Sequence, residues 1–155
     1  MCHLRVTHLA LLRNPAARAA LAADPALLPN AVEELLRYDS PVQMTLRFTF
    51  EDTPLGNHTL HKGDLVLLLI GGANRDPEQF PDPDRLDIVR PNASTHLSFG
   101  GGIHYCLGAS LARLEGEIAV GALLRRMPHL ALATERLTWR ESPVLHGLSA
   151  LPVTF

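Results

Sequence analysis

The sequence is poor in features that define several classes of protein. Its 155 residues include two cysteines, Cys2 and Cys106, with no C-x-x-C spacing, which supports neither a disulfide framework nor a multi-cysteine zinc site. The longest unbroken apolar run, Leu65–Ile70, is far shorter than the roughly 20 residues that span a bilayer. The N-terminus also lacks the pattern of a secretory signal. These absences predict a cytoplasmic protein with no membrane partner.

The chain has no excess of charge of either sign. Fourteen Lys and Arg against 16 Asp and Glu give a formal net charge of -2, which offers no net attraction to phosphate backbones, so we expect no nucleic-acid partner. An apolar fraction of 46% with 19% charged residues is ordinary for a globular protein and excludes a disordered chain. A chain of this length can bury a core of its own.

The first third of the chain predicts helices. Apolar residues at helical spacing run into Asn14-Pro15, where Asn14 can cap a second, alanine-rich helix that continues to Ala23. Asn30 can cap a third helix over 31–38.

The middle of the chain predicts a small antiparallel sheet followed by an irregular coil. Residues 43–50 alternate strictly, which predicts a half-buried strand. Its apolar face carries Met44, Leu46, Phe48 and Phe50. Turn residues at 52–57 and 62–64 extend the sheet over 43–70. Four prolines between Arg75 and Asn92 then favour a long coil, and a coil of this length is usually functional or firmly held.

A glycine-rich turn over 99–108 leads into the longest predicted helix, 107–127. The expected apolar stripe of this helix consists of Leu107, Leu111, Leu114 and Ile118. The tail, 130–155, predicts short strands. Together these elements predict an α+β fold, mainly helical with a small antiparallel sheet.

The glycine-rich turn does not fit a nucleotide-binding loop, because no Gly-Lys-Ser/Thr follows and Tyr105 stands where the dinucleotide pattern needs glycine. It does place Cys106 directly before a long helix. Unpaired backbone N–H groups and the helix dipole favour a thiolate at such a position, as a metal ligand requires. From the residues alone, the alternative is that Cys106 is a small buried apolar side chain.

Read as a whole, the stretch from Phe99 to Glu115 resembles the haem-binding signature of the cytochromes P450, specifically the soluble bacterial kind. The match covers ten positions: Phe99, Gly100, Gly102, His104, Cys106, Gly108, Leu111, Ala112, Arg113 and Glu115. The resemblance implies haem b held by the Cys106 thiolate, a ligand that favours O–O cleavage. Gly102 and Gly108 would leave room for the turn and the porphyrin, and Phe99 would shield the sulfur.

The resemblance also implies further haem contacts. Those near the cysteine are Phe99, Gly100, Gly102, Leu107, Gly108 and Ala112. Arg47 and His104 correspond to partners of the haem propionates. Without the signature, Arg47 is a surface cation on a strand and His104 a satisfied core histidine.

Three further stretches match the same family in order. Glu34 and Arg37 resemble its Glu-x-x-Arg motif, and Arg85 within 80–87 resembles the arginine that completes a three-residue salt bridge. Residues 73–77 are typical of the segment before the coil. Taken alone, Glu34 and Arg37 are an ordinary solvated pair on a helix.

A complete P450 is more than twice as long as this chain. On the resemblance, its substrate pocket, distal helix and oxygen-activating acid–alcohol pair precede the matched region, so we expect no catalytic residue within 1–155. Residues 1–155 then form the C-terminal part of a P450 domain. This part runs from the end of the distal helix in 1–12 through the Glu-x-x-Arg helix, small sheet, proline-rich meander and haem-thiolate loop to the proximal helix. Truncation, a split gene or a mis-called start would explain such a fragment.

The implied function is monooxygenation, an oxidation of paired donors that incorporates molecular oxygen, and the isolated fragment is expected to be incompetent. The implied partners are a ferredoxin and its reductase on the proximal face, a small organic substrate and a missing N-terminal chain. One alternative is a non-catalytic haem-binding or degenerate remnant. Another is a zinc or redox-thiol module that uses Cys106 and His104.

Overall fold

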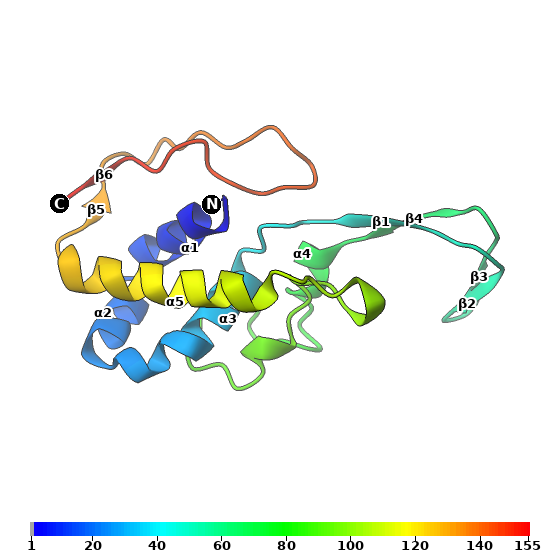
Figure 1. Cartoon of the computed structure of the whole chain (residues 1–155), viewed down its shortest axis with the longest axis horizontal. Helices are drawn as coiled ribbons and strands as arrows, with labels where there is room; N and C mark the ends of the chain where they lie inside the picture. The colour runs from blue at the N-terminus through cyan, green and yellow to red at the C-terminus, as the bar shows by residue number, and fades with distance from the viewer. Residues whose placement is uncertain (1) are drawn as a thin grey trace.

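The computed structural model describes residues 2–155 as a group of packed helices from which a long hairpin extends (Figure 1). The helices are α1 (Cys2–Arg13), α2 (Pro15–Ala23), α3 (Leu28–Tyr38), α4 (Ile70–Ala73) and α5 (Ala109–Arg126), with 3-10 turns η1 (Pro25–Leu27), η2 (Ala93–Thr95) and η3 (Gly102–His104). The strands are β1 (Thr45–Phe48), β2 (Thr53–Leu55), β3 (His58–Leu60), β4 (Leu65–Leu68), β5 (Ala131–Leu132) and β6 (Val153–Thr154). The predicted α+β class is confirmed.

The hydrophobic core lies between α1, α2, α3 and α5. Its buried members are Ala10, Leu11, Leu21, Ala31, Leu35, Ile88, Val120 and Leu124. Close approach of α3 and α5 depends on Gly116, because a Cβ at this position would lie 3.0 Å from Cγ1 of Val32. Helix α5 is thus fixed against α3, the helix that carries Glu34 and Arg37.

Two asparagines predicted as helix caps have other roles. Asn14 does precede α2, but its side chain makes no cap bond, and Nδ2 donates to the Ala10 carbonyl at 2.8 Å. Helix α3 begins at Leu28, because Pro29 is compatible with a first helical turn. Asn30 therefore lies inside the helix, and its amide donates to the carbonyl of Ile88 at 2.9 Å. The predicted Asn30 cap was wrong, and the residue ties α3 to the coil instead.

The predicted sheet over 43–70 is present as two separate ladders. Strand β1 pairs antiparallel with β4, with Thr45 opposite Leu68, and the β2–β3 hairpin follows at the far end of this ladder (Figure 1). The tail forms the predicted short strands, in which β5 pairs with β6.

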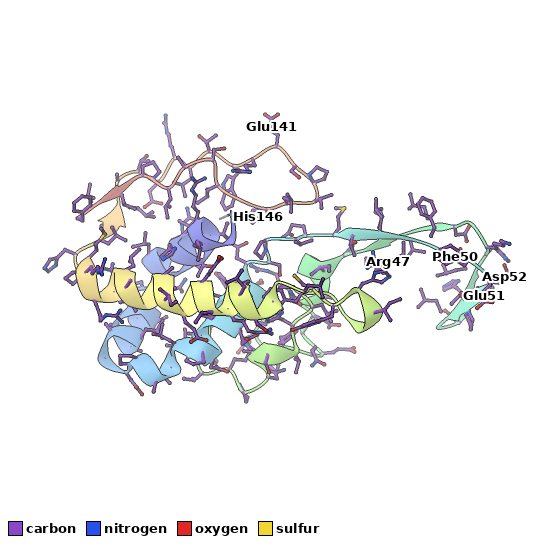
Figure 2. All side chains as sticks on the ribbon, in the orientation of Figure 1. Arg47, Phe50, Glu51, Asp52, Glu141 and His146 are labelled. Atoms are coloured by element: carbon purple, nitrogen blue, oxygen red, sulfur yellow. The ribbon has the colours of Figure 1, made fainter. Side chains whose placement is uncertain are left out.

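The apolar face of β1 is exposed, contrary to the prediction of a half-buried strand. Phe48 is 63% exposed and Phe50 is 91% exposed, whereas the polar Thr45 and Arg47 are the better covered side chains. Figure 2 shows Phe50 near the outer end of the hairpin, away from the helices. The side chains do alternate between the two faces, but within residues 2–155 the hairpin extends past the packed helices, which therefore do not cover its apolar face (Figure 1).

The predicted stripe on the long helix is also exposed. Leu107 precedes the helix, which begins at Ala109, and Leu107, Leu111, Leu114 and Ile118 are all exposed. The buried side of α5 carries Ala109, Gly116, Val120, Gly121 and Leu124 instead. Small residues make this side inconspicuous in a hydrophobicity pattern, which explains the wrong choice of face.

The predicted coil between α4 and η2 contains no helix or strand over residues 74–92. No helix within residues 2–155 is long and apolar enough to cross a membrane.

Candidate functional site

The glycine-rich turn folds back on itself before α5. Gly100 has φ 72° and Gly102 has φ 58°, both in the left-handed region that glycine adopts without steric cost. The Cys106 N–H donates to the carbonyl of Phe99 at 2.9 Å and closes the loop. The two glycines thus allow a reversal that brings the backbones of Phe99 and Cys106 together.

Cys106 is exposed at the start of the long helix. Its carbonyl accepts the N–H of Ala109, the first residue of α5, at 3.2 Å. A Cβ at Gly108 would lie 3.8 Å from the cysteine sulfur, so glycine leaves this side of the sulfur uncovered. The alternative that Cys106 is a buried apolar residue is therefore wrong.

A cavity of about 600 Å³ lies between this loop and the base of the β1–β4 ladder. It is lined by Thr45, Arg47, Leu67, Leu68, Leu69, Ile70, Ala73, Leu97, Gly100, Gly101 and His104. Arg47 and His104, far apart in the sequence, line the same space. Figure 2 shows Arg47 on the side of β1 that faces the loop before α5.

The cavity combines a largely aliphatic wall with two nitrogen-bearing side chains. Arg47 is oriented within it by its own strand, because Nη1 donates to Thr45 Oγ1 at 3.0 Å and to the Leu46 carbonyl at 2.6 Å. His104 approaches from the Cys106 loop. An apolar, flat group with anionic substituents fits such a lining, as haem with its two propionates does.

The expected haem contacts are divided between the cavity and its surroundings. Arg47, Gly100 and His104 line the cavity. The others, Phe99, Gly102, Leu107, Gly108 and Ala112, lie on the same loop or the first turn of α5 but outside this lining. Leu107 is fully exposed.

The Glu-x-x-Arg pair is a buried ion cluster. Arg37 Nε lies 2.7 Å from Glu34 Oε2, and both side chains are 0% exposed, so the alternative of a solvated pair is wrong. Arg90 completes the cluster, with its Nε 3.1 Å from the same oxygen.

Arg85 is not the third member of this cluster, and that prediction was wrong. Its side chain is 67% exposed and Nη2 lies 2.9 Å from Oδ2 of Asp87. Only the backbone of Arg85 takes part, because its carbonyl accepts from Nη2 of Arg90 at 3.1 Å. The coil turns after Arg85, so the arginine five residues later points inward.

Two of the structurally important residues lacked a usable sequence signal. Arg90 stands between Val89 and Pro91 with no motif around it. His96 has no metal-ligand spacing or motif around it in the sequence, yet its side chain is 1% exposed and its Nε2 lies 3.0 Å from Oε2 of Glu33. In the described part of the chain, no three His, Cys, Asp or Glu residues form a group that could hold a metal ion, so the zinc alternative gains no support there.

Comparison with known proteins identifies the family. The family model for cytochrome P450 matches residues 20–142. The chain is 52% identical over 149 residues to the vitamin D(3) 25-hydroxylase of Pseudonocardia autotrophica, covering 94% of this chain and 37% of that protein. It is 52% identical over 148 residues to cytochrome P450 107B1 of Saccharopolyspora erythraea, covering 94% and 36%. The chain belongs to the cytochrome P450 family.

Solved structures agree with this assignment. The P450 monooxygenase TamI, bound to tirandamycin C, superposes with a TM-score of 0.92 at 47% identity, covering 97% of this chain and 38% of that one. P450BioI, in complex with a fatty-acyl acyl carrier protein, gives 0.91 at 48% identity, covering 99% and 39%. The chain therefore spans less than two fifths of the relatives it matches here. Proteins of this family bind haem through a cysteine thiolate, and bacterial members act with redox partners on their substrates.

Proposed function

We propose that this chain is the C-terminal, haem-ligating portion of a P450 monooxygenase domain, with the Cys106 thiolate as the ligand of haem iron. The observation that carries the proposal is that one loop bears both the cysteine and part of the cavity wall. The same turn, 99–108, presents an exposed Cys106 at the start of α5 and contributes Gly100 and His104 to the cavity beside Arg47.

Different residues of the chain would bind different parts of the haem. Cys106 supplies the thiolate, and the N-terminal end of α5 stabilises its negative charge. Arg47 and His104 donate to the propionates, while the aliphatic cavity wall excludes water from one face. Gly100, Gly102 and Gly108 keep the loop compact, and Phe99, Leu107 and Ala112 are the proposed apolar contacts near the ligand. When bound, the haem supplies oxygen activation tuned by its thiolate ligand.

The proposed activity requires the complete P450 fold, of which residues 1–155 form a part. Substrate binding and proton delivery to oxygen are proposed for a part of the fold outside 1–155, which places no catalytic side chain in this chain. A ferredoxin with its reductase is the proposed electron source, a small organic molecule the substrate and the cytoplasm the location. Residues 1–155 alone, with haem, this electron source and reduced nicotinamide nucleotide, are expected to give no substrate-dependent hydroxylation.

A chimaera tests whether this portion is competent. The chain replaces the matching segment of the 52% identical vitamin D(3) 25-hydroxylase, and haem spectrum and hydroxylation are measured. We expect a thiolate spectrum and product formation, both lost in the Cys106→Ala chimaera. A chimaera with a normal thiolate spectrum and no product would favour the alternative of a haem-binding remnant. A folded chimaera without a thiolate spectrum would contradict the proposed ligand.

A further inference from the structure

A second ion cluster, separate from that of Glu34, lies between α3, α5 and the Cys106 loop. Its centre is the carboxylate of Glu33, whose side chain is 13% exposed. Arg113 of α5 binds it with two nitrogens, Nε to Oε1 at 2.5 Å and Nη2 to Oε2 at 3.1 Å. His96 Nε2 lies 3.0 Å from Oε2. Glu33 thus joins an arginine of α5 to a histidine of the segment before the loop.

The Arg113 branch reaches both ends of the loop. Its Nη1 donates to the hydroxyl of Tyr105 at 3.0 Å, and its guanidinium carbon lies 4.7 Å from the centre of the Phe99 ring. Tyr105 directly precedes Cys106, and the Phe99 carbonyl accepts the Cys106 N–H. A guanidinium over an aromatic face is attractive, and the forked pair with Glu33 fixes its orientation. Arg113 therefore contacts Phe99 and Tyr105, which lie at the two ends of the segment closed by the hydrogen bond between Cys106 and Phe99.

The His96 branch ends at the same aromatic ring. Its Nδ1 accepts the N–H of Ser98 at 3.1 Å, so Nε2 carries the proton and donates to Glu33. The imidazole also packs against Phe99, with ring centres 5.6 Å apart. Both branches from Glu33 thus constrain Phe99.

We propose that Glu33 is a positioning residue for the Cys106 loop, and that it acts through Arg113 and His96 on Phe99 and Tyr105. The role of the loop in holding haem rests on the proposed function, but the positioning itself is a property of the chain without haem. Glu33 does not line the cavity, and its hydrogen bonds are to Arg113 and His96, so its effect on the loop is indirect.

The carboxylate is suited to this role because it stays ionised. Burial alone would raise the pKa of Glu33, but hydrogen bonds from His96 and Arg113 outweigh it and lower the pKa to about 2. The same pairing raises the pKa of Arg113. The Glu33–Arg113 ion pair consequently keeps both charges throughout the neutral range.

Amide hydrogen exchange of the whole chain tests the proposal without haem. The rate is measured by NMR at Cys106, whose N–H closes the loop, and at Val120 in the buried part of α5, in a Cys2→Ala background. Glu33→Gln leaves an amide nitrogen that cannot accept from Arg113 or His96, and Arg113→Lys keeps the charge without the fork or the stacking surface. Glu135→Gln is the matched control, because its carboxylate pairs with Arg13 only at 3.8 Å on the surface.

We expect the amide exchange rate at Cys106 to rise about 10-fold in Glu33→Gln and in Arg113→Lys. This factor is the lower end of the losses in metal affinity or activity that follow removal of a residue that orients a metal ligand. The rate at Val120 and both rates in Glu135→Gln should stay unchanged. Equal acceleration at Cys106 and Val120 would overturn the proposal in favour of a general stabilising role. An unchanged rate at Cys106, or no protection there in the starting chain, would also overturn it.

A spectroscopic measurement separates this proposal from the proposed function. In the haem-loaded chain, Glu33→Gln should decrease the red-shifted CO band in favour of the band of a protonated or displaced thiol. If the Cys106→Ala chain kept the thiolate spectrum, the proposed ligand would fail, whereas the exchange result at Cys106 would still decide the role of Glu33.

Discussion

Nε of Arg90 lies 3.1 Å from Oε2 of Glu34, although 56 residues separate them in the chain and both side chains are buried. The same guanidinium donates to the carbonyls of Pro81 at 2.7 Å and Arg85 at 3.1 Å. The coil is therefore wrapped around an arginine that is itself anchored to α3. This arrangement gives residues 74–92 a fixed path without regular secondary structure.

Arg90→Ala should lower the free energy of unfolding by about 3–5 kcal/mol, because it removes one partner of a buried ion cluster and leaves coil carbonyls unpaired. Arg85→Ala should cost less than about 1 kcal/mol, since its pair with Asp87 is on the surface. Urea unfolding followed by circular dichroism measures both. Equal losses in the two variants would contradict the assignment of Arg90 to the cluster.

The cluster also shows what the sequence could and could not predict. Glu34 and Arg37 were identifiable because they lie three residues apart on one predicted helix, and local spacing fixes their contact. The third partner depends on the path of a proline-rich coil, in which Arg85 and Arg90 are equivalent until the turns are known. The contact between Glu34 and Arg90 joins residues 56 positions apart through irregular backbone, and such a contact leaves no periodic pattern in the sequence.

The two exposed apolar faces also show a limit of prediction from the sequence. The alternation over 43–50 and the stripe from Leu107 to Ile118 each predict an apolar face. In the described chain the stripe is exposed, and so is the first face except for the partly covered Met44. Periodicity identifies an apolar face but does not say which segment covers it. The actual contact face of α5 uses Gly116 and Gly121, which hydrophobicity does not distinguish from solvent-exposed residues. The loop over 99–108, in contrast, was predictable in position because its glycines and cysteine form a local pattern.

Acid should weaken the chain through Glu33. Its pKa in the folded state is lowered to about 2, against 4.5 for the free side chain, so its stabilising contribution is complete above about pH 4.5 and is lost as the pH falls from 4.5 to 2. The free energy of unfolding of the unchanged chain should therefore fall more steeply in this window than that of Glu33→Gln. Urea titrations at a series of pH values measure the two slopes, and parallel slopes would contradict the pairing of Glu33 with His96 and Arg113.

The exposed stripe on α5 should promote association of the chain, because several large apolar side chains share one surface. Replacing Leu111 and Ile118 together by lysine should shift sedimentation velocity profiles toward the monomer at little cost in melting temperature. Ser110→Lys, on an exposed position of the same helix, is the control for added charge. Equal association of the double variant and the unchanged chain would mean that another surface is responsible.

The most direct test of Cys106 as the haem ligand is the absorption spectrum of the reduced, CO-treated chain during titration with haem. Cysteine ligation gives a strongly red-shifted Soret band, and we expect this band for the unchanged chain and for Cys2→Ala, with weak haem affinity in both. The band should be lost in Cys106→Ala, because the signature loop then has no thiolate. A Cys106→Ala chain with the same red-shifted band would show that Cys106 is not the ligand of the haem iron.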